Sequence, residues 1–322
     1  MNALRALRFA LIAAALCAAE TAAAQAWPAK PVRLVITFPP GGPSEIVTRL
    51  VGERLHAELK QPFVIENRAG AGGNVGTAAV ATSAPDGHTF GITTDTLFTV
   101  NPLVYRKMPF DPWSDIVPVT LLGSFSQMMV CNPAVRAKSL SELLELARRE
   151  KLSYASGGPG VPGHLAAELL FSTTGTTMLH VPYKGPAAAT TDVMGGQVNC
   201  GFLATPTVLP HVKAGKLNAL AVSTAKRSPL APDVPAAAEA GAPGFDAPFY
   251  LVLFAPKGVP ADIAARMNRE VIKALDEKEV KDRAATMDIV TVGGSPQQAT
   301  KVLKDAASKW APVVQRIGLK LD

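Results

Sequence analysis

The sequence predicts an α/β fold in two domains, and three observations lead to this class. Short apolar segments alternate with amphipathic helical segments along the chain, and Gly and Pro gather at the junctions from strand to helix. Residues 27–322 also exceed what one ordinary hydrophobic core can hold. The alternation is typical of largely parallel sheets covered by helices, in which ligands bind beyond the carboxyl ends of the strands. We therefore look for function at the strand-to-helix junctions.

The N-terminal segment, residues 1–26, predicts a cleavable secretory signal peptide. Arg5 and Arg8 give it a positive start, an apolar run at residues 9–19 is too short to span a bilayer, and residues 24–26 (AQA) form a small-residue cleavage site. A transmembrane anchor is the alternative, but no stop-transfer pattern follows. We expect an exported mature chain that begins near residue 27.

Apolar segments rich in β-branched residues predict the strands in chain order. They cover residues 32–38, 63–67, 89–93, 116–122, 127–131, 152–156, 179–182, 198–203, 217–223 and 249–255. Between residues 44 and 60, apolar side chains recur at three- and four-residue spacing, which predicts an amphipathic helix. Capping boxes predict two further helix starts, at Ser139 with Glu142 and at Ser295 with Gln298.

Composition and spacing argue against several classes of function. The net charge of +6 is mildly basic, without Lys/Arg runs or interleaved aromatic residues, so no nucleic acid is expected. The patterns G-x-S-x-G, H-E-x-x-H, C-x-x-C and Walker A do not occur, and we expect no catalytic residue, no metal and no cofactor. After the signal peptide only Cys131 and Cys200 remain, and the sequence leaves open whether they form a disulfide or stay as buried thiols.

Two glycine-rich junctions predict an anion site built from backbone. FPPGGPSEI at residues 38–46 follows the first strand, and its glycines let main chain approach a ligand, while the next helix offers unpaired N–H groups and a positive dipole end. A plain Pro-Gly turn without a ligand is the alternative for this loop alone. RAGAGGNVGTAAV at residues 68–80 follows the second strand, so a second such loop is expected at a neighbouring strand end.

A third glycine-rich junction raises a rival hypothesis. GGPGVPGHLAAELL at residues 157–170 has the spacing G-x-G-x-x-G from Gly158 to Gly163, as in dinucleotide-binding sites. Two prolines lie inside the pattern, and the next strand ends in Tyr183 and Lys184 where a ribose-binding acid is expected. The rival is an NAD(P)-dependent oxidoreductase, and the signal peptide argues against it because these cofactors are cytoplasmic.

A series of motifs in fixed order spans residues 27–260. In chain order these are WPAKPVRLVITFPPGG, ENRAGAGGNVG, APDGHTF, NPLVYRKMPFDPWSDIVPV, LSYASGGPGVPGHLAAELL, HVPYKG, GGQV, GKLNALAVS, PDVPAAAEAGAPGF and FAPKGVP. Together they resemble the Bug family, the substrate-binding proteins of tripartite tricarboxylate transporters, over nearly the whole mature chain.

The resemblance implies a type II periplasmic-binding-protein fold. Two α/β lobes, each a mostly parallel sheet flanked by helices, would close on a small ligand in the cleft between them. The expected division is a signal peptide at residues 1–26, lobe 1 at 27–125 and 247–322, and lobe 2 at 126–246.

The resemblance also implies the function. It is that of a periplasmic, monomeric, non-enzymatic receptor that captures a small carboxylate: a di- or tricarboxylate, an aromatic acid or an acidic amino acid. The receptor would deliver its ligand to a membrane transporter with one large and one small subunit. A sensor that serves no transporter is the alternative within the family.

The ligand-binding residues follow from the matching motifs. Loops of lobe 1 would hold a ligand carboxylate through backbone N–H groups and ordered water. The implied residues of lobe 1 are Pro40, Gly41, Gly42, Pro43, Ser44, Ala71, Gly72, Gly73, Asn74, Thr94, Asp95 and Phe249. Those of lobe 2 are Ser156, Gly157, His164, Lys184, Asp192 and Thr205. Asp95 would either meet the ammonium group of an amino acid ligand or belong to the loop alone. Glu45 departs from the Asp that is common after the first loop.

Overall fold

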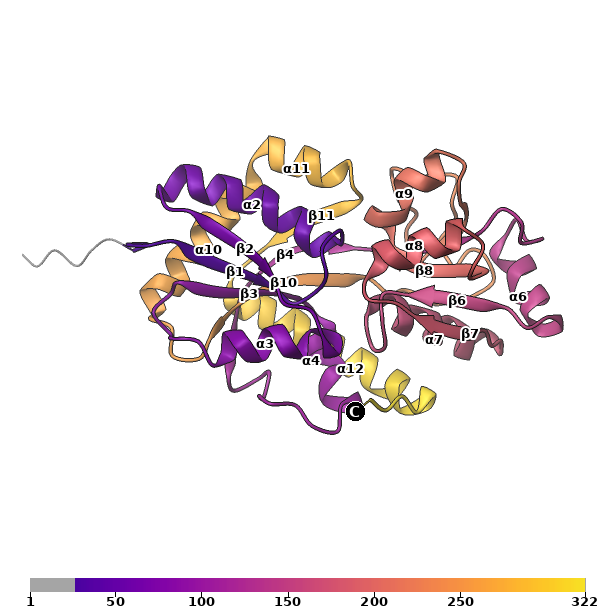
Figure 1. The fold of residues 1–322 in the computed structure, drawn as a ribbon, viewed down its shortest axis with the longest axis horizontal. Helices are drawn as coiled ribbons and strands as arrows, with labels where there is room; N and C mark the ends of the chain where they lie inside the picture. Colours follow the sequence, from indigo (N-terminus) through magenta and orange to yellow (C-terminus); the bar gives the residue numbers. More distant parts are fainter. Residues whose placement is uncertain (1–26, 322) are drawn as a thin grey trace, which may run out of the picture.

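The computed structural model describes residues 27–321, so the expected signal peptide lies outside the described residues. Strands and helices alternate along this range (Figure 1). The strands are β1 (Val32–Ile36), β2 (Phe63–Asn67), β3 (Thr89–Thr94), β4 (Ile116–Phe125), β5 (Gln127–Cys131), β6 (Ser153–Ser156), β7 (Leu179–Pro182), β8 (Cys200–Ala204), β9 (Asn218–Val222), β10 (Phe249–Pro256) and β11 (Ile289–Gly293).

The helices occupy most of the remaining chain. They are α2 (Pro43–Leu59), the short 3-10 helix η1 (Ala71–Gly73), α3 (Asn74–Ala81), α4 (Thr96–Thr99), α5 (Asn101–Val104), α6 (Leu140–Arg149), α7 (Pro162–Thr174), α8 (Pro186–Met194), α9 (Thr205–Lys213), α10 (Ala261–Asp276), α11 (Lys278–Ala285) and α12 (Pro296–Ile317). Between residues 27 and 321, none of them is long and apolar enough to cross a membrane.

Lobe 1 is built on a six-stranded sheet in the order β11-β4-β10-β3-β1-β2, on the left of Figure 1. Side chains alternate between its two faces, as the two-residue period of a strand requires. Leu34 and Ile36 pack in one apolar cluster with Leu55 of α2, whereas Val35 packs in another with Leu303 of α12. Helices α2 and α10 therefore cover one face, and α3, α4 and α12 cover the other (Figure 1).

Lobe 2 is built on a five-stranded sheet in the order β7-β6-β8-β5-β9, on the right of Figure 1. β5 and β8 are antiparallel with Cys131 opposite Cys200, and these two cysteines form a disulfide. This bond decides between the two alternatives that the sequence left open. It joins two neighbouring strands at the centre of the lobe, where both cysteines are fully buried.

The chain passes between the lobes at two places that are hydrogen-bonded to each other. Ser126 alone separates β4 from β5, and the return passage precedes β10. Ser223 links the two passages, because its hydroxyl accepts from the Gln127 N–H at 2.9 Å and donates to the Ala247 carbonyl at 2.8 Å. Asp288, just before β11, accepts from the hydroxyls of Ser126 at 3.1 Å and Ser228 at 2.5 Å. The crossing is therefore a hydrogen-bonded hinge region.

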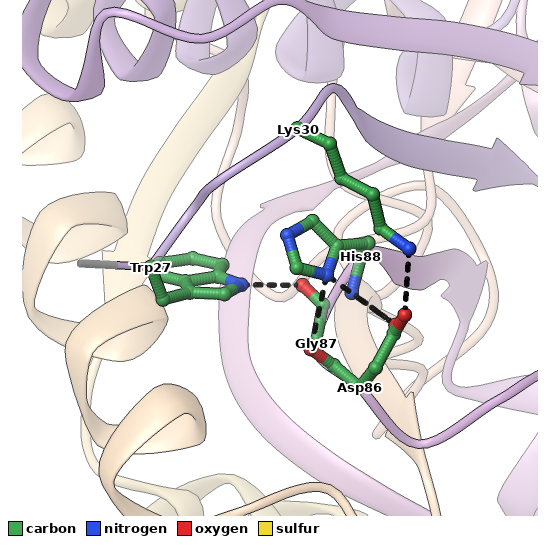
Figure 2. Close-up of polar contacts among 5 residues, drawn as sticks. All are labelled: Trp27, Lys30, Asp86, Gly87 and His88. Atoms are coloured by element: carbon green, nitrogen blue, oxygen red, sulfur yellow. Dashed lines mark hydrogen bonds and ion pairs between the residues drawn. The ribbon is translucent and has the colours of Figure 1, made fainter. Parts of the chain in front are cut away.

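The first described residues are anchored on the loop before β3, as Figure 2 shows. The Trp27 indole donates to the Gly87 carbonyl at 2.8 Å, and Lys30 pairs with Asp86 at 2.9 Å. Asp86 also accepts from the His88 N–H at 3.0 Å. Burial of the Trp27 ring, which is 8% exposed, fixes where the chain enters β1.

The two-lobed α/β class that the sequence predicts is confirmed. Most strands of each sheet run in one direction, whereas β10 and β11 in lobe 1 and β5 in lobe 2 run against the others. The edge strand β11 was not predicted. The capping box at Ser295 is present, whereas at Ser139 only half forms, because the Glu142 side chain accepts from the Lys138 N–H instead.

Candidate ligand cleft

Two adjoining pockets lie between the lobes and form one cleft. The first leaves about 500 Å³ unfilled by protein, counting the part open to solvent, and its lining comes from both lobes. It is lined by Phe38, Pro39, Gly42, Pro43, Ser44, Thr94, Phe125, Gln127, Gly157, Val161, Pro162, Gly163, Gly185, Pro186, Leu203 and Ala204. The second extends over the loop at residues 69–73 toward Lys184, and it shares with the first Phe38, Pro39, Gly157, Val161 and Gly185.

Four helices begin at the first pocket. The N-cap residues of α2, α7, α8 and α9 are Gly42, Val161, Gly185 and Ala204, and all four line it. None of these four helix starts is capped by a side-chain hydrogen bond. Away from the pocket, α10 and α11 also lack such a cap, whereas serines cap α6 and α12. A helix N-terminus offers unpaired N–H groups and a partial positive charge. The pocket therefore favours an anion, although no basic side chain is among the described residues that line it.

The first glycine loop is held from within by Glu45. Its carboxylate accepts from the Gly41 N–H at 2.7 Å and pairs with Arg49 at 2.5 Å. The hydrogen bond from the Gly41 N–H, together with Arg49, lowers the pKa of Glu45 against the opposing effect of burial. The Gly41 amide, which the sequence predicts as a ligand donor, is thus already bonded, and Gly42 and Ser44 are the loop's cleft-lining residues that follow it.

The second glycine loop is fixed by two asparagines. The Asn101 side chain donates to the Asn74 Oδ1 at 2.8 Å and to the Gly72 carbonyl at 3.0 Å. Gly72 has φ +60°, and a β-carbon there would lie 2.8 Å from the Tyr105 hydroxyl. Asn74 therefore supports the loop from behind, while Ala71, Gly72 and Gly73 line the second pocket.

A buried cluster lies under the third glycine loop. The rings of His164 and His180 stack with centroids 4.0 Å apart. His164 Nδ1 accepts from the Gly160 N–H at 3.0 Å, and the Ser156 hydroxyl is hydrogen-bonded to His180 Nε2 at 2.7 Å. Burial lowers the pKa of His164 to about 3, with His180 as a second cause, and burial lowers the pKa of His180 to about 4. Ser156 and His164 thus shape the loop from below.

The predicted acids also lie outside the cleft lining. Asp95 is fully buried, and its Oδ1 accepts from the Tyr250 N–H at 3.2 Å. Burial raises the pKa of Asp95 to about 7, and its Oδ2 has no partner among residues 27–321. Asp192 accepts from the Tyr183 hydroxyl at 2.7 Å. Each acid is therefore placed to support the backbone or a neighbouring side chain.

Two other predicted residues belong to the hinge region and the core. The Thr205 hydroxyl is hydrogen-bonded to that of Ser126 at 2.6 Å. Phe249 is fully buried and stacks on Trp310 with ring centroids 5.5 Å apart. Neither lines the two pockets.

The structure thus brings together about half of the predicted binding residues. Those that line the cleft are Gly42, Pro43, Ser44, Ala71, Gly72, Gly73, Thr94, Gly157 and Lys184. Those outside the lining are Pro40, Gly41, Asn74, Asp95, Ser156, His164, Asp192, Thr205 and Phe249. Phe125, which the sequence favours for an aromatic ligand, lines the pocket, whereas sequence reasoning missed Gln127, Val161 and Leu203. A polar residue at the start of the apolar segment QMMVC was the available signal for Gln127.

Comparison with known proteins agrees with this architecture. The family model described as tripartite tricarboxylate transporter family receptor matches residues 47–319. Protein BugT of Bordetella pertussis is 35% identical over 306 residues, which is 94% of each chain. The solved structure of R. palustris Rpa4515 with adipate is 33% identical with a TM-score of 0.89, and the match covers 91% of this chain and 99% of that one.

A second solved structure, MatC (Rpa3494) from Rhodopseudomonas palustris with bound malate, is 30% identical with a TM-score of 0.83. That match covers 89% of this chain and 100% of the other. The resemblance to the Bug family and the two-lobed fold are therefore confirmed. The chain belongs to the tripartite tricarboxylate transporter family of receptors.

Proposed function

We propose that this protein is an extracytoplasmic solute receptor that captures a small carboxylate in the cleft between its lobes. One observation carries the proposal: four helix N-termini without side-chain caps converge on one pocket. Backbone N–H groups at helix ends bind an anion without a chemical reaction, as capture and release require. The adipate in Rpa4515 and the malate in MatC are ligands of the same chemical class.

The proposed binding set is the part of the lining that offers hydrogen-bond donors. Gly42, Ser44, Gly72, Gly157 and Lys184 would contact the ligand. The other predicted residues would act as supports that position these loops. We propose the lobe boundaries at residues 126 and 246, next to the two passages through the hinge region. Closure about these passages would bury the ligand, and the closed form would be the one that a transporter recognises.

The receptor role extends to partners and location. We propose that the protein works in the periplasm as a monomer and delivers its ligand to a membrane transporter with one large and one small subunit. The family assignment supports a receptor over the oxidoreductase alternative. The glycine loop before α7, on which that alternative rests, also lies on the same cleft as the other helix starts.

A thermal-shift screen tests the carboxylate assignment. The mature protein is unfolded and refolded with its disulfide intact to remove any bound ligand, then mixed with adipate, malate, citrate, benzoate, aspartate, glucose or hexanamide. Carboxylates are expected to raise Tm, whereas glucose and hexanamide leave it unchanged. Stabilisation by glucose or hexanamide with no response to any carboxylate would reject the proposal.

A further inference from the structure

Gln127 occupies a fixed position at the edge of the cleft. It is the first residue of β5, directly after the passage from lobe 1. Its N–H donates to the Ser223 hydroxyl at 2.9 Å, and its carbonyl accepts from the Ser223 N–H at 2.8 Å. In the sheet it lies opposite Ala204, the N-cap of α9. Hydrogen bonds to Ser223 and pairing with β8 therefore fix the backbone of Gln127, and with it the position from which the side chain extends.

The side-chain amide nitrogen of Gln127 is an unsatisfied hydrogen-bond donor. The residue is 2% exposed and lines the first pocket. Its Nε2 is buried and has no partner anywhere in residues 27–321. Its Oε1 lies beside the start of α7, 3.1 Å from where a β-carbon of Gly163 would be. Buried polar groups are nearly always bonded, so an unpartnered amide at a pocket indicates a group that arrives with the ligand.

The amide lies among apolar side chains and two helix starts. Phe125, Val161 and Leu203 supply apolar lining of the same pocket. The start of α7 adjoins the Gln127 side chain, and Ala204, the N-cap of α9, lies opposite Gln127 in the sheet. An oxygen atom of the ligand that enters this region can meet the Gln127 amide as a side-chain donor with no other partner among residues 27–321.

We propose that Gln127 determines specificity for a second oxygen-bearing group of the ligand. Its Nε2 donates a hydrogen bond to a carboxylate or hydroxyl oxygen at the end of the ligand distant from a carboxylate held at the starts of α2 and α8, which lie together where Gly42 approaches Pro186. This inference rests on the proposed function, because it needs a carboxylate in the cleft. It adds a selection rule: an acid with a second oxygen group binds, and its analogue with a methyl group there binds weakly.

The physical reason for selection is the cost of leaving the amide unbonded. A site built to hydrogen-bond a ligand group discriminates strongly against an analogue without that group, whereas an apolar pocket distinguishes similar groups poorly. The amide Nε2 donates to hydroxyl and carboxylate oxygens alike, so the rule concerns an oxygen acceptor and not a charge.

Calorimetry with matched acids tests the proposal. Adipate is compared with hexanoate, and malate with 2-hydroxybutyrate, since each pair differs by a terminal carboxylate in place of a methyl group. The refolded wild-type protein is expected to bind the better dicarboxylate at least about tenfold more tightly than its methyl analogue. Gln127→Met, which keeps the side-chain length, should lose this preference by weakening the dicarboxylate alone. Gln197→Met, at an exposed position of lobe 2, is the matched control and should keep the preference.

The outcomes separate this inference from the function on which it rests. A wild-type protein that binds both members of a pair equally, or a Gln127→Met variant that keeps the preference, overturns the role of Gln127 and leaves the carboxylate receptor standing. A wild-type protein that binds none of the four acids overturns the role of Gln127, and one that binds none of the screened carboxylates either overturns both. If Gln127→Met does not fold, Gln127→Glu decides: an added negative charge should weaken the dicarboxylate more than its analogue, and equal weakening overturns the proposal.

Discussion

Pro39 of lobe 1 and Gly185 of lobe 2 face each other across the cleft, and a β-carbon on Gly185 would lie 3.2 Å from the Pro39 ring. Nearby, Gly41 approaches Ala187 in the same way, with 3.3 Å from its β-carbon position to that of Ala187. The two lobes therefore touch through the glycine loops, which is the geometry of a closed cleft. The absence of side chains at these positions lets the lobes come together.

Gly185→Ala should weaken ligand binding by hindering closure. The new β-carbon meets Pro39 only when the lobes are together, so the open form gains population and affinity falls by about tenfold or more. Gly175→Ala is the matched control, because Gly175 also has a positive φ but its β-carbon position has no neighbour within 4 Å. Calorimetry measures affinity, and small-angle scattering measures compactness with and without adipate or malate. Equal affinities in the two variants would contradict the closure model.

Two Glu45 variants should distinguish the effect of its hydrogen bond on the shape of the first loop from the effect of its negative charge. Glu45→Ala removes the acceptor for the Gly41 N–H and should weaken carboxylate binding by roughly tenfold, since the loop loses its internal hydrogen bond. Glu45→Gln keeps an acceptor oxygen and removes a negative charge near the anion, so its affinity should equal or exceed that of the wild type. Calorimetry at low salt is the measurement. A Glu45→Gln variant as weak as Glu45→Ala would show that the carboxylate charge itself is needed.

The stacked pair His164 and His180 should make stability fall in acid. Both pKa values are lowered in the folded state, so the pair is neutral there, whereas the unfolded chain binds protons below about pH 6.5. The contribution is complete above that pH and is lost as the pH falls toward 4 to 3. Between pH 7 and 5, His164 alone should account for about 2 kcal/mol of the free energy of unfolding. Urea unfolding of the wild type and His164→Asn at both pH values checks this, and an equal loss in both would refute it.

Asp95→Asn should raise stability in alkaline conditions. Burial raises the pKa of Asp95 in the folded protein to about 7, whereas in the unfolded chain the carboxyl is ionised above about pH 4. The free energy of unfolding that Asp95 costs the protein therefore grows as the pH rises from about 4 through 7. At pH 8 the variant should melt at least about 2 °C above the wild type, and the difference should be smaller at pH 5 and vanish below about pH 4. Carboxylate affinity should not change, since Asp95 does not line the cleft. Loss of aspartate binding in the variant would instead restore Asp95 as a ligand-binding residue.

Removal of the disulfide should destabilise the protein without altering its cleft. The bond joins residues 69 apart in sequence, and the chain-entropy argument assigns such a loop about 4 kcal/mol. Cys131→Ala with Cys200→Ala should therefore lower the free energy of urea unfolding by up to this amount, with carboxylate affinity retained. The reduced wild type should behave in the same way. An unchanged stability would mean that the antiparallel pairing of β5 and β8 suffices.

The sequence predicts most of the strands because their signal is local. β2, β5 and β7 begin and end where the apolar segments do, and the other predicted strands shift by a few residues. β11 was missed although Ile289, Val290 and Val292 favour a strand, because it is a short edge strand that pairs only with β4. The antiparallel direction of β10 was missed because the direction of strand pairing depends on residues far away in the sequence. A local pattern carries no information about it.

The sequence predicted the parts of the candidate site that backbone loops form. It did not predict which side chains point away from the cleft. Glycine and proline mark Gly42 and Gly72 as loop positions, and both line the cleft. Asp95 follows β3 and His164 follows the third glycine loop, but the fold turns their side chains into buried hydrogen bonds. Gln127 looks like part of an ordinary apolar strand, and only its unpartnered amide in three dimensions reveals it.

The place of β10 in the larger sheet has a consequence for how the chain is completed during synthesis. The five-stranded sheet uses only residues 127–222, so every strand of lobe 2 is available early. β10 lies between β3 and β4, and without it the six-stranded sheet is divided into two parts. Strands β1–β3 can therefore join β4 in one sheet only after residues 249–256 have been added. Lobe 1, which begins first in the sequence, is thus completed after lobe 2.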